Sequence, residues 1–129
     1  MIMTMVLVDT SVWVAHFRKS NESFESLLIN DQILCHPLVL IELACGSPPA
    51  PRSKTLSYIQ KLQQAKVATP AETLDFIEKH QIQESGCGAI DVSLLASTLL
   101  SENAQLWTLD KSLEKLAVRL GVSYGNKLH

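Results

Sequence analysis

The chain has 129 residues and a mass of 14.2 kDa, enough for one compact domain whose core needs no disulfide or structural metal. Hydrophobic residues make up 47% and charged residues 19%, which excludes a disordered or low-complexity chain. The 13 acidic and 11 basic side chains give a formal net charge of -2. A nucleic-acid binder that works by bulk positive charge is therefore excluded, and any anionic ligand must be held by local features.

The cysteines and the amino-terminal run bear on the cellular compartment. Cys35, Cys45 and Cys87 lack a C-x-x-C spacing, which disfavours both a disulfide framework and a thiolate zinc site. The apolar run Met1–Val8 has no basic leader and meets Asp9 too soon for a signal peptide. No apolar stretch approaches the ~20 residues that span a membrane. We therefore expect a cytoplasmic protein with no membrane partner.

The first half of the chain alternates short apolar runs with helical patterns. Met5–Val8 and Ile33–Cys35 predict strands, because both runs are apolar on both faces, as central parallel strands are. Pro37 suits the first turn of a helix, and Gly46 suits its end. The helices expected in this half span residues 10–19, 20–28, 37–45 and 54–64.

The second half continues the alternation after the helix over 54–64, which itself follows a proline-rich loop at 47–51. Lys66–Ala68 predicts a short edge strand, and Thr69–Glu72 is a capping box with proline at the first helical position. The other expected elements are helices over 70–81, 89–101 and 111–120 and strands over 105–108 and 122–124. This order predicts a single α/β domain over residues 1–129, with a parallel sheet of about five strands flanked by helices on both faces.

Four acidic side chains stand where a charge is unexpected. Asp9 and Asp110 each follow a predicted strand, Asp91 lies in the first turn of an apolar helix, and Glu42 lies in a helix that is apolar nearly all round. A carboxylate in apolar surroundings costs several kcal/mol unless a partner offsets the lost hydration. Lys111 adjoins Asp110, but no Lys or Arg lies within six residues of the other three.

The predicted topology brings these four carboxylates to one edge of the sheet. Ligands of open parallel sheets bind beyond the carboxyl ends of the strands, where Asp9 and Asp110 fall; Asp91 reaches the same edge from its helix start, and Glu42 from the side. Carboxylates ~4 Å apart repel by several kcal/mol per pair, and a hard cation such as Mg²⁺ or Mn²⁺ removes that repulsion. Structural alternatives remain for three of them: Asp9 and Asp110 as helix caps, and Asp91 as a partner of the helix dipole.

These acids and their settings carry a family resemblance. The chain resembles the PIN-domain ribonucleases, and most closely the small single-domain toxins of the VapC type. The matching motifs share an order and spacing that extend over nearly the whole chain. They are Val6–Ser11, Ile41–Leu43, Gly88–Ala96 and Leu106–Asp110.

The resemblance implies a fold, an activity and partners. It implies a compact parallel sheet, usually of five strands, between helices, and an endoribonuclease that hydrolyses RNA with Mg²⁺ or Mn²⁺. It further implies a homodimer neutralised by a VapB-type antitoxin in a type II toxin–antitoxin system. The family's catalytic, metal-binding quartet falls on Asp9, Glu42, Asp91 and Asp110. The positions implied to hold these carboxylates or to contact phosphate are Thr10, Ser11 and Thr108.

Other side chains have weaker functional readings. Arg52 and Lys54 beside the proline-rich loop, and Lys111, Lys115 and Arg119 on one helix face, could guide RNA, although an ordinary solvated surface accounts for each.

The two tryptophans and His36 are expected to have structural roles. Trp13 and Trp107 could stack on bases, but their apolar neighbours favour the core, and we expect a structural role for His36.

A phosphoacceptor domain of the receiver type also clusters aspartates at strand ends. Such a domain needs a pair of acidic residues after its first strand. Here Thr10 follows Asp9, which argues against this class. A non-catalytic interaction module with the PIN fold also remains open.

Overall fold

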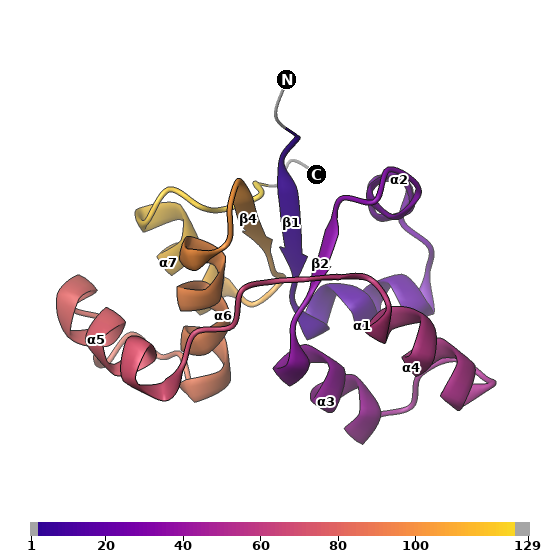
Figure 1. Ribbon diagram of the computed structural model, residues 1–129, viewed down its shortest axis with the longest axis horizontal. Coiled ribbons are helices and arrows are strands. Elements are labelled where there is room, and N and C mark those ends of the chain that lie inside the picture. Colours follow the sequence, from indigo (N-terminus) through magenta and orange to yellow (C-terminus); the bar gives the residue numbers. More distant parts are fainter. Residues whose placement is uncertain (1–2, 126–129) are drawn as a thin grey trace.

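The computed structural model describes residues 3–125 (Figure 1). Helices α1–α4 gather on one side of a central sheet, and helices α5–α7 gather on the other (Figure 1). The elements in chain order are β1 (Met5–Val8), α1 (Thr10–Arg18), α2 (Glu22–Ile29), β2 (Ile33–Cys35), α3 (Pro37–Cys45), α4 (Arg52–Gln60), β3 (Gln63–Gln64), α5 (Pro70–His80), α6 (Ala89–Leu100), β4 (Ala104–Trp107) and α7 (Lys111–Arg119). The predicted α/β class, with a parallel sheet between helices, is confirmed.

The sheet places the reversal of its strand order beside β1. All strand pairs are parallel, and the order is β3-β2-β1-β4. The chain builds outward from β1 to β2 and β3, then crosses back to place β4 on the other edge of β1. Val8 is in register with Trp107, so β1 and β4 end at the same level. The crevice beyond these two carboxyl ends is the usual ligand site of such a sheet.

The strand count is lower than the predicted five, and one strand lies earlier than predicted. The backbone N–H of Ala65 still donates to the Cys35 carbonyl of β2 at 2.9 Å. The next N–H groups turn toward α6, where Lys66 donates to the Ser101 hydroxyl at 2.8 Å and Ala68 donates to the Ser97 hydroxyl at 3.0 Å. The prediction of an edge strand at 66–68 was therefore wrong, because these residues bond side chains instead of a strand.

The predicted strand at 122–124 is reduced to one parallel bridge. Leu106 of β4 pairs with Ser123, and its N–H and C=O bond Val122 and Tyr124 at 2.7 and 2.9 Å. The chain reaches this position through Gly121, whose φ of +73° suits glycine after the end of α7. The sheet of the described residues therefore has four strands and this single added bridge.

The core lies around β1 and the helices that pack against it. Val6, Leu7 and Val8 are fully buried, as expected of a central parallel strand covered on both faces. Trp13 and Trp107 are also buried, and Trp13 packs edge-on against Phe24 with ring centroids 4.8 Å apart. Core packing therefore occupies both tryptophans, and neither is free to stack on bases.

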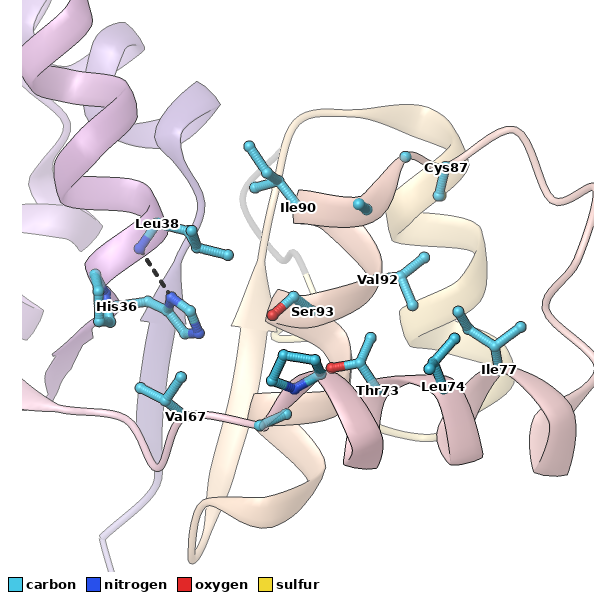
Figure 2. A pocket seen from close by; sticks show the side chains of 15 residues that line it. His36, Leu38, Val67, Thr73, Leu74, Ile77, Cys87, Ile90, Val92 and Ser93 are labelled. Carbon is cyan, nitrogen blue, oxygen red and sulfur yellow. Dashed lines mark hydrogen bonds between the residues drawn. The ribbon is translucent and has the colours of Figure 1, made fainter.

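A buried polar junction ties α3 to α6. His36 is fully buried, and its Nδ1 accepts the Leu38 N–H at 3.1 Å, which caps α3 (Figure 2). The proton of the neutral ring then sits on Nε2, which donates to the Ser97 hydroxyl oxygen at 3.0 Å. That oxygen also accepts the Ala68 N–H. Burial lowers the pKa of His36, which favours this neutral form.

From residue 3 to residue 125, no helix is both long enough and apolar enough to cross a bilayer.

Candidate active site at the carboxyl edge of the sheet

Asp9 occupies the switch point between β1 and β4. Its backbone N–H donates to the Trp107 carbonyl at 2.9 Å, which extends the ladder by one residue. Asp9 precedes α1 without capping it through its side chain. Instead Oδ2 accepts the hydroxyls of Ser11 and Thr108, each at 2.7 Å. The residue is only 6% exposed, and Oδ1 has no hydrogen-bond partner in the described part of the chain.

The same hydroxyls fix the segment that follows β4. The Ser11 hydroxyl oxygen accepts the Leu109 N–H at 3.0 Å, and the Thr108 hydroxyl oxygen accepts the Asp110 N–H at 3.0 Å. Residues 108–110 are thereby held against the start of α1. Two of the three supporting residues expected from the family resemblance thus lie against Asp9.

Glu42 reaches the site from α3, one turn in from the helix start. Its Oε1 accepts the Thr10 hydroxyl at 2.6 Å, and Thr10 is the first residue of α1. The side chain is half-buried between the two helices, and its Oε2 has no hydrogen-bond partner within residues 3–125. Thr10 therefore orients Glu42 as Ser11 and Thr108 orient Asp9.

Asp110 and Asp91 complete the set from two helix starts. Asp110 caps α7, since its Oδ1 accepts the Leu113 N–H at 2.9 Å, while the residue stays exposed. Asp91 lies half-buried in the first turn of α6 and makes no hydrogen bond through its side chain in the described region. The capping reading of Asp110 is thus correct, and it leaves Oδ2 available.

Asp91 lies near enough to the other three carboxylates to feel their charges. Burial, followed by the charges of Asp9, Asp110 and Glu42, raises the pKa of Asp91 to about 6 from its ordinary value of 3.8. Among residues 3–125, none of the four carboxylates forms an ion pair with a Lys, Arg or His. Burial chiefly, and also the carboxylates of Asp91 and Asp110, raise the pKa of the Cys87 thiol, which lies at the same edge.

The chemistry of this donor set fits a hard divalent cation. As the side chains stand, no group of three or more His, Cys, Asp or Glu residues between positions 3 and 125 is drawn together into a ready-made metal site. Each of the four carboxylates nevertheless keeps at least one oxygen without a hydrogen-bond partner in that range. Carboxylate oxygens that repel one another and form no ion pair with a protein cation are the ligands that Mg²⁺ and Mn²⁺ take.

The site contains features that sequence reasoning did not find. Cys87 stands beside the acids, and only its closeness to Asp91 in the chain hinted at this. Two of the arginines that could guide RNA also hydrogen-bond the backbone: Arg52 donates to carbonyls at the end of α3, and Arg119 donates to the His80 carbonyl.

Fold and site together define a PIN domain. The PIN domain family model matches residues 6–119, and the chain belongs to this family. It is 39% identical over 124 residues to Ribonuclease VapC32 of Mycobacterium tuberculosis, in strains CDC 1551 / Oshkosh and ATCC 25618 / H37Rv, with 96% of this chain and 99% of each relative covered. The fold is also that of PAE2754 from Pyrobaculum aerophilum, a crystal structure with a TM-score of 0.57 at 19% identity, covering 92% of this chain and 90% of that one.

These comparisons confirm the resemblance to the VapC-type PIN ribonucleases. Membership in the PIN family sets aside the receiver-type alternative, which belongs to a different fold family. The roles of the individual site residues are not decided by the comparisons and stay predictions.

Proposed function

We propose that this chain is an endoribonuclease that hydrolyses RNA phosphodiester bonds with Mg²⁺ or Mn²⁺, and that it is the toxin of a type II toxin–antitoxin pair. The observation that carries this proposal is the placement of four carboxylates from four elements at one sheet edge, where none of them forms an ion pair with a Lys, Arg or His of the described residues. The relatives named Ribonuclease VapC32 support RNA as the substrate.

Each site residue has a proposed role in this reaction. Asp9, Glu42, Asp91 and Asp110 hold the divalent ion, which when bound activates water and neutralises charge at the phosphate. The two hydroxyls that bond Asp9 Oδ2 orient this carboxylate and leave its Oδ1 for the ion, and the Thr10 hydroxyl does the same for Oε2 of Glu42. Such supporting hydrogen bonds typically change metal affinity or activity 10–100-fold when they are lost.

We further propose the assembly that the family resemblance implies. The whole chain, residues 1–129, forms one PIN-like domain that acts in the cytoplasm as a homodimer. A VapB-type antitoxin neutralises it. Likeness to proteins named VapC over 96% of the chain supports this proposal.

The proposed activity is tested by incubating structured RNAs with the protein in Mn²⁺, in Mg²⁺ and in EDTA. We expect cleavage with metal, no cleavage in EDTA, and no cleavage by Asp9→Asn with metal. Asp75→Asn, an exposed carboxylate on α5, is the matched control and should cut like the wild type. Circular dichroism checks that both variants are folded. Cleavage that persists in EDTA or in Asp9→Asn would contradict the metal mechanism.

The same experiment separates the enzyme from the non-catalytic alternative. A folded wild-type protein that cuts none of the RNAs with either metal, yet binds its antitoxin, would be an interaction module that retains the fold. All four acids are present and coupled, which favours the enzyme.

A further inference from the structure

A groove opens from the acidic site on the side of Glu42. It has a volume of about 590 Å³ and lies between α1, α3 and the proline-rich loop, which share one side of the molecule (Figure 1). Its lining includes Phe17, Arg18, Glu42, Pro48 and Pro49. Pockets that bind small ligands typically have volumes of about 300–1,000 Å³. We propose that this groove binds one nucleotide of the RNA substrate, with Arg18 on a phosphate, an inference that rests on the proposed function.

The groove adjoins the reacting centre through Glu42. This side chain lines the groove and also belongs to the coupled carboxylates, and Thr10 fixes its position. A nucleotide in the groove therefore lies next to the position where the scissile phosphate must stand. Because the chain carries a net charge of -2 and four of its carboxylates lie at the site, an RNA strand needs a local cation there.

Arg18 is available to supply that cation. It is exposed in the last turn of α1 and makes no hydrogen bond or ion pair with any residue that the structure describes. In particular, it does not come within ion-pair distance of Glu42, although both line the groove. Arg52 and Arg119, by contrast, bond backbone carbonyls. A guanidinium binds phosphate through two parallel N–H groups, which suits a backbone contact.

The apolar part of the groove lining is fixed in position. Phe17 is half-buried and packs against Trp13 with centroids 5.9 Å apart, so its ring has a set position. Two hydrogen bonds hold the loop that carries Pro48 and Pro49. The Thr55 hydroxyl donates to the Pro49 carbonyl at 2.8 Å, and Arg52 donates to the Gly46 carbonyl at the end of α3. A base beside an aromatic ring gains affinity with little sequence preference. The occupant that this wall and cation fit is a single-stranded nucleotide.

The first test measures RNA binding without cleavage. In the Asp9→Asn background, fluorescein-labelled oligouridylate is titrated at several salt concentrations, with and without Arg18→Ala. We expect roughly tenfold weaker binding and a salt slope smaller by about 0.7, the loss of one phosphate contact on a single strand. Lys19→Ala, the neighbouring exposed cation, is the matched control and should keep the slope. Arg18→Lys should restore part of the affinity.

The second test measures cleavage by the otherwise wild-type protein. Arg18→Ala should raise KM for RNA several-fold and leave both kcat and the Mn²⁺ dependence near their wild-type values. Equal KM values and equal salt slopes for Arg18→Ala and Lys19→Ala would overturn the inference, and would leave the proposed function intact if the wild type cuts RNA. A wild type that cuts no RNA in Mn²⁺ would overturn the proposed function itself.

Discussion

Replacing Asp91 by Asn should make the metal-free protein more stable. Burial and three neighbouring carboxylates raise the pKa of Asp91 from 3.8 to about 6, so the folded protein disfavours its charged form. The position in the first turn of α6 opposes this, because a helix start favours a negative charge by about 0.3–1 kcal/mol. Since the pKa is raised all the same, repulsion and burial outweigh the helix dipole.

The size of the effect follows from the pKa difference. A rise from 3.8 to about 6, at about 1.4 kcal/mol per pKa unit, gives at most about 3 kcal/mol. Asp91 is only half-buried and solvent screens the charge, so we expect about 1 kcal/mol. For a chain of this length that corresponds to a melting temperature higher by roughly 3–5 °C.

The pH dependence gives the sign of the effect. A carboxyl whose folded pKa is raised contributes stability that is complete below about pH 4 and is lost as the pH rises through about 6. The stability gap between Asp91→Asn and the wild type should therefore be near zero at about pH 4 and reach its full size at about pH 8. Asp75→Asn, the exposed control on α5, should show no such trend.

The assay is urea unfolding in EDTA at several pH values, repeated with Mn²⁺. With metal the order of stability should reverse, because an ion at 100 times its Kd stabilises the wild type by about 2.7 kcal/mol while the variant has lost a ligand. A gap that does not change with pH, or a variant less stable than the wild type at about pH 8 in EDTA, would refute the reasoning.

Substitutions at three further positions test separate contacts of the site and the fold. Thr108→Val removes a hydroxyl from Asp9 and should weaken Mn²⁺ binding about 10–100-fold in a thermal-shift titration; unchanged affinity would count against the supporting role. Ser97→Ala strands two buried N–H donors and should cost about 1–3 kcal/mol in urea unfolding, a loss that a value near zero would disprove. Asp110→Asn should keep the cap on Leu113 and lose RNA cleavage, whereas Asp110→Ala should also lose about 1 kcal/mol of stability; full cleavage by the Asn variant would limit Asp110 to capping.

Local chemistry made much of the fold predictable. A strand apolar on both faces, a capping box and a proline at a helix start each depend on neighbours in the chain, and β1, α5 and α3 formed where those patterns stood. The convergence of the acids followed from topology, because Asp9 and Asp110 come directly after parallel strands. Glu42 was conspicuous since its helix is otherwise apolar.

Contacts between residues far apart in the chain explain the features that the sequence did not predict. Lys66 and Ala68 carry β-favouring neighbours, but hydroxyls of α6 take their N–H groups, and nothing within a few residues reports that competition. The sequence marks Arg52 as an exposed cation near the proline-rich loop, but it does not indicate that its guanidinium donates to a carbonyl at the end of α3. The sequence around Arg18 is ordinary for the end of a helix. The groove beside it forms only because the proline-rich loop and Glu42, which are distant in the chain, lie next to it in the fold.

The distribution of hydrogen bonds over the four acids explains where the site is adaptable. Asp9, Glu42 and Asp110 each have one oxygen fixed by a hydroxyl or a backbone N–H, so their rotamers are held with or without an ion. Asp91 has no such donor in the described region and bears the charges of the other three. We therefore expect Asp91 to be the carboxylate that takes up a proton when no cation is present. If it is also a metal ligand, as proposed, proton binding and metal binding will compete at this position.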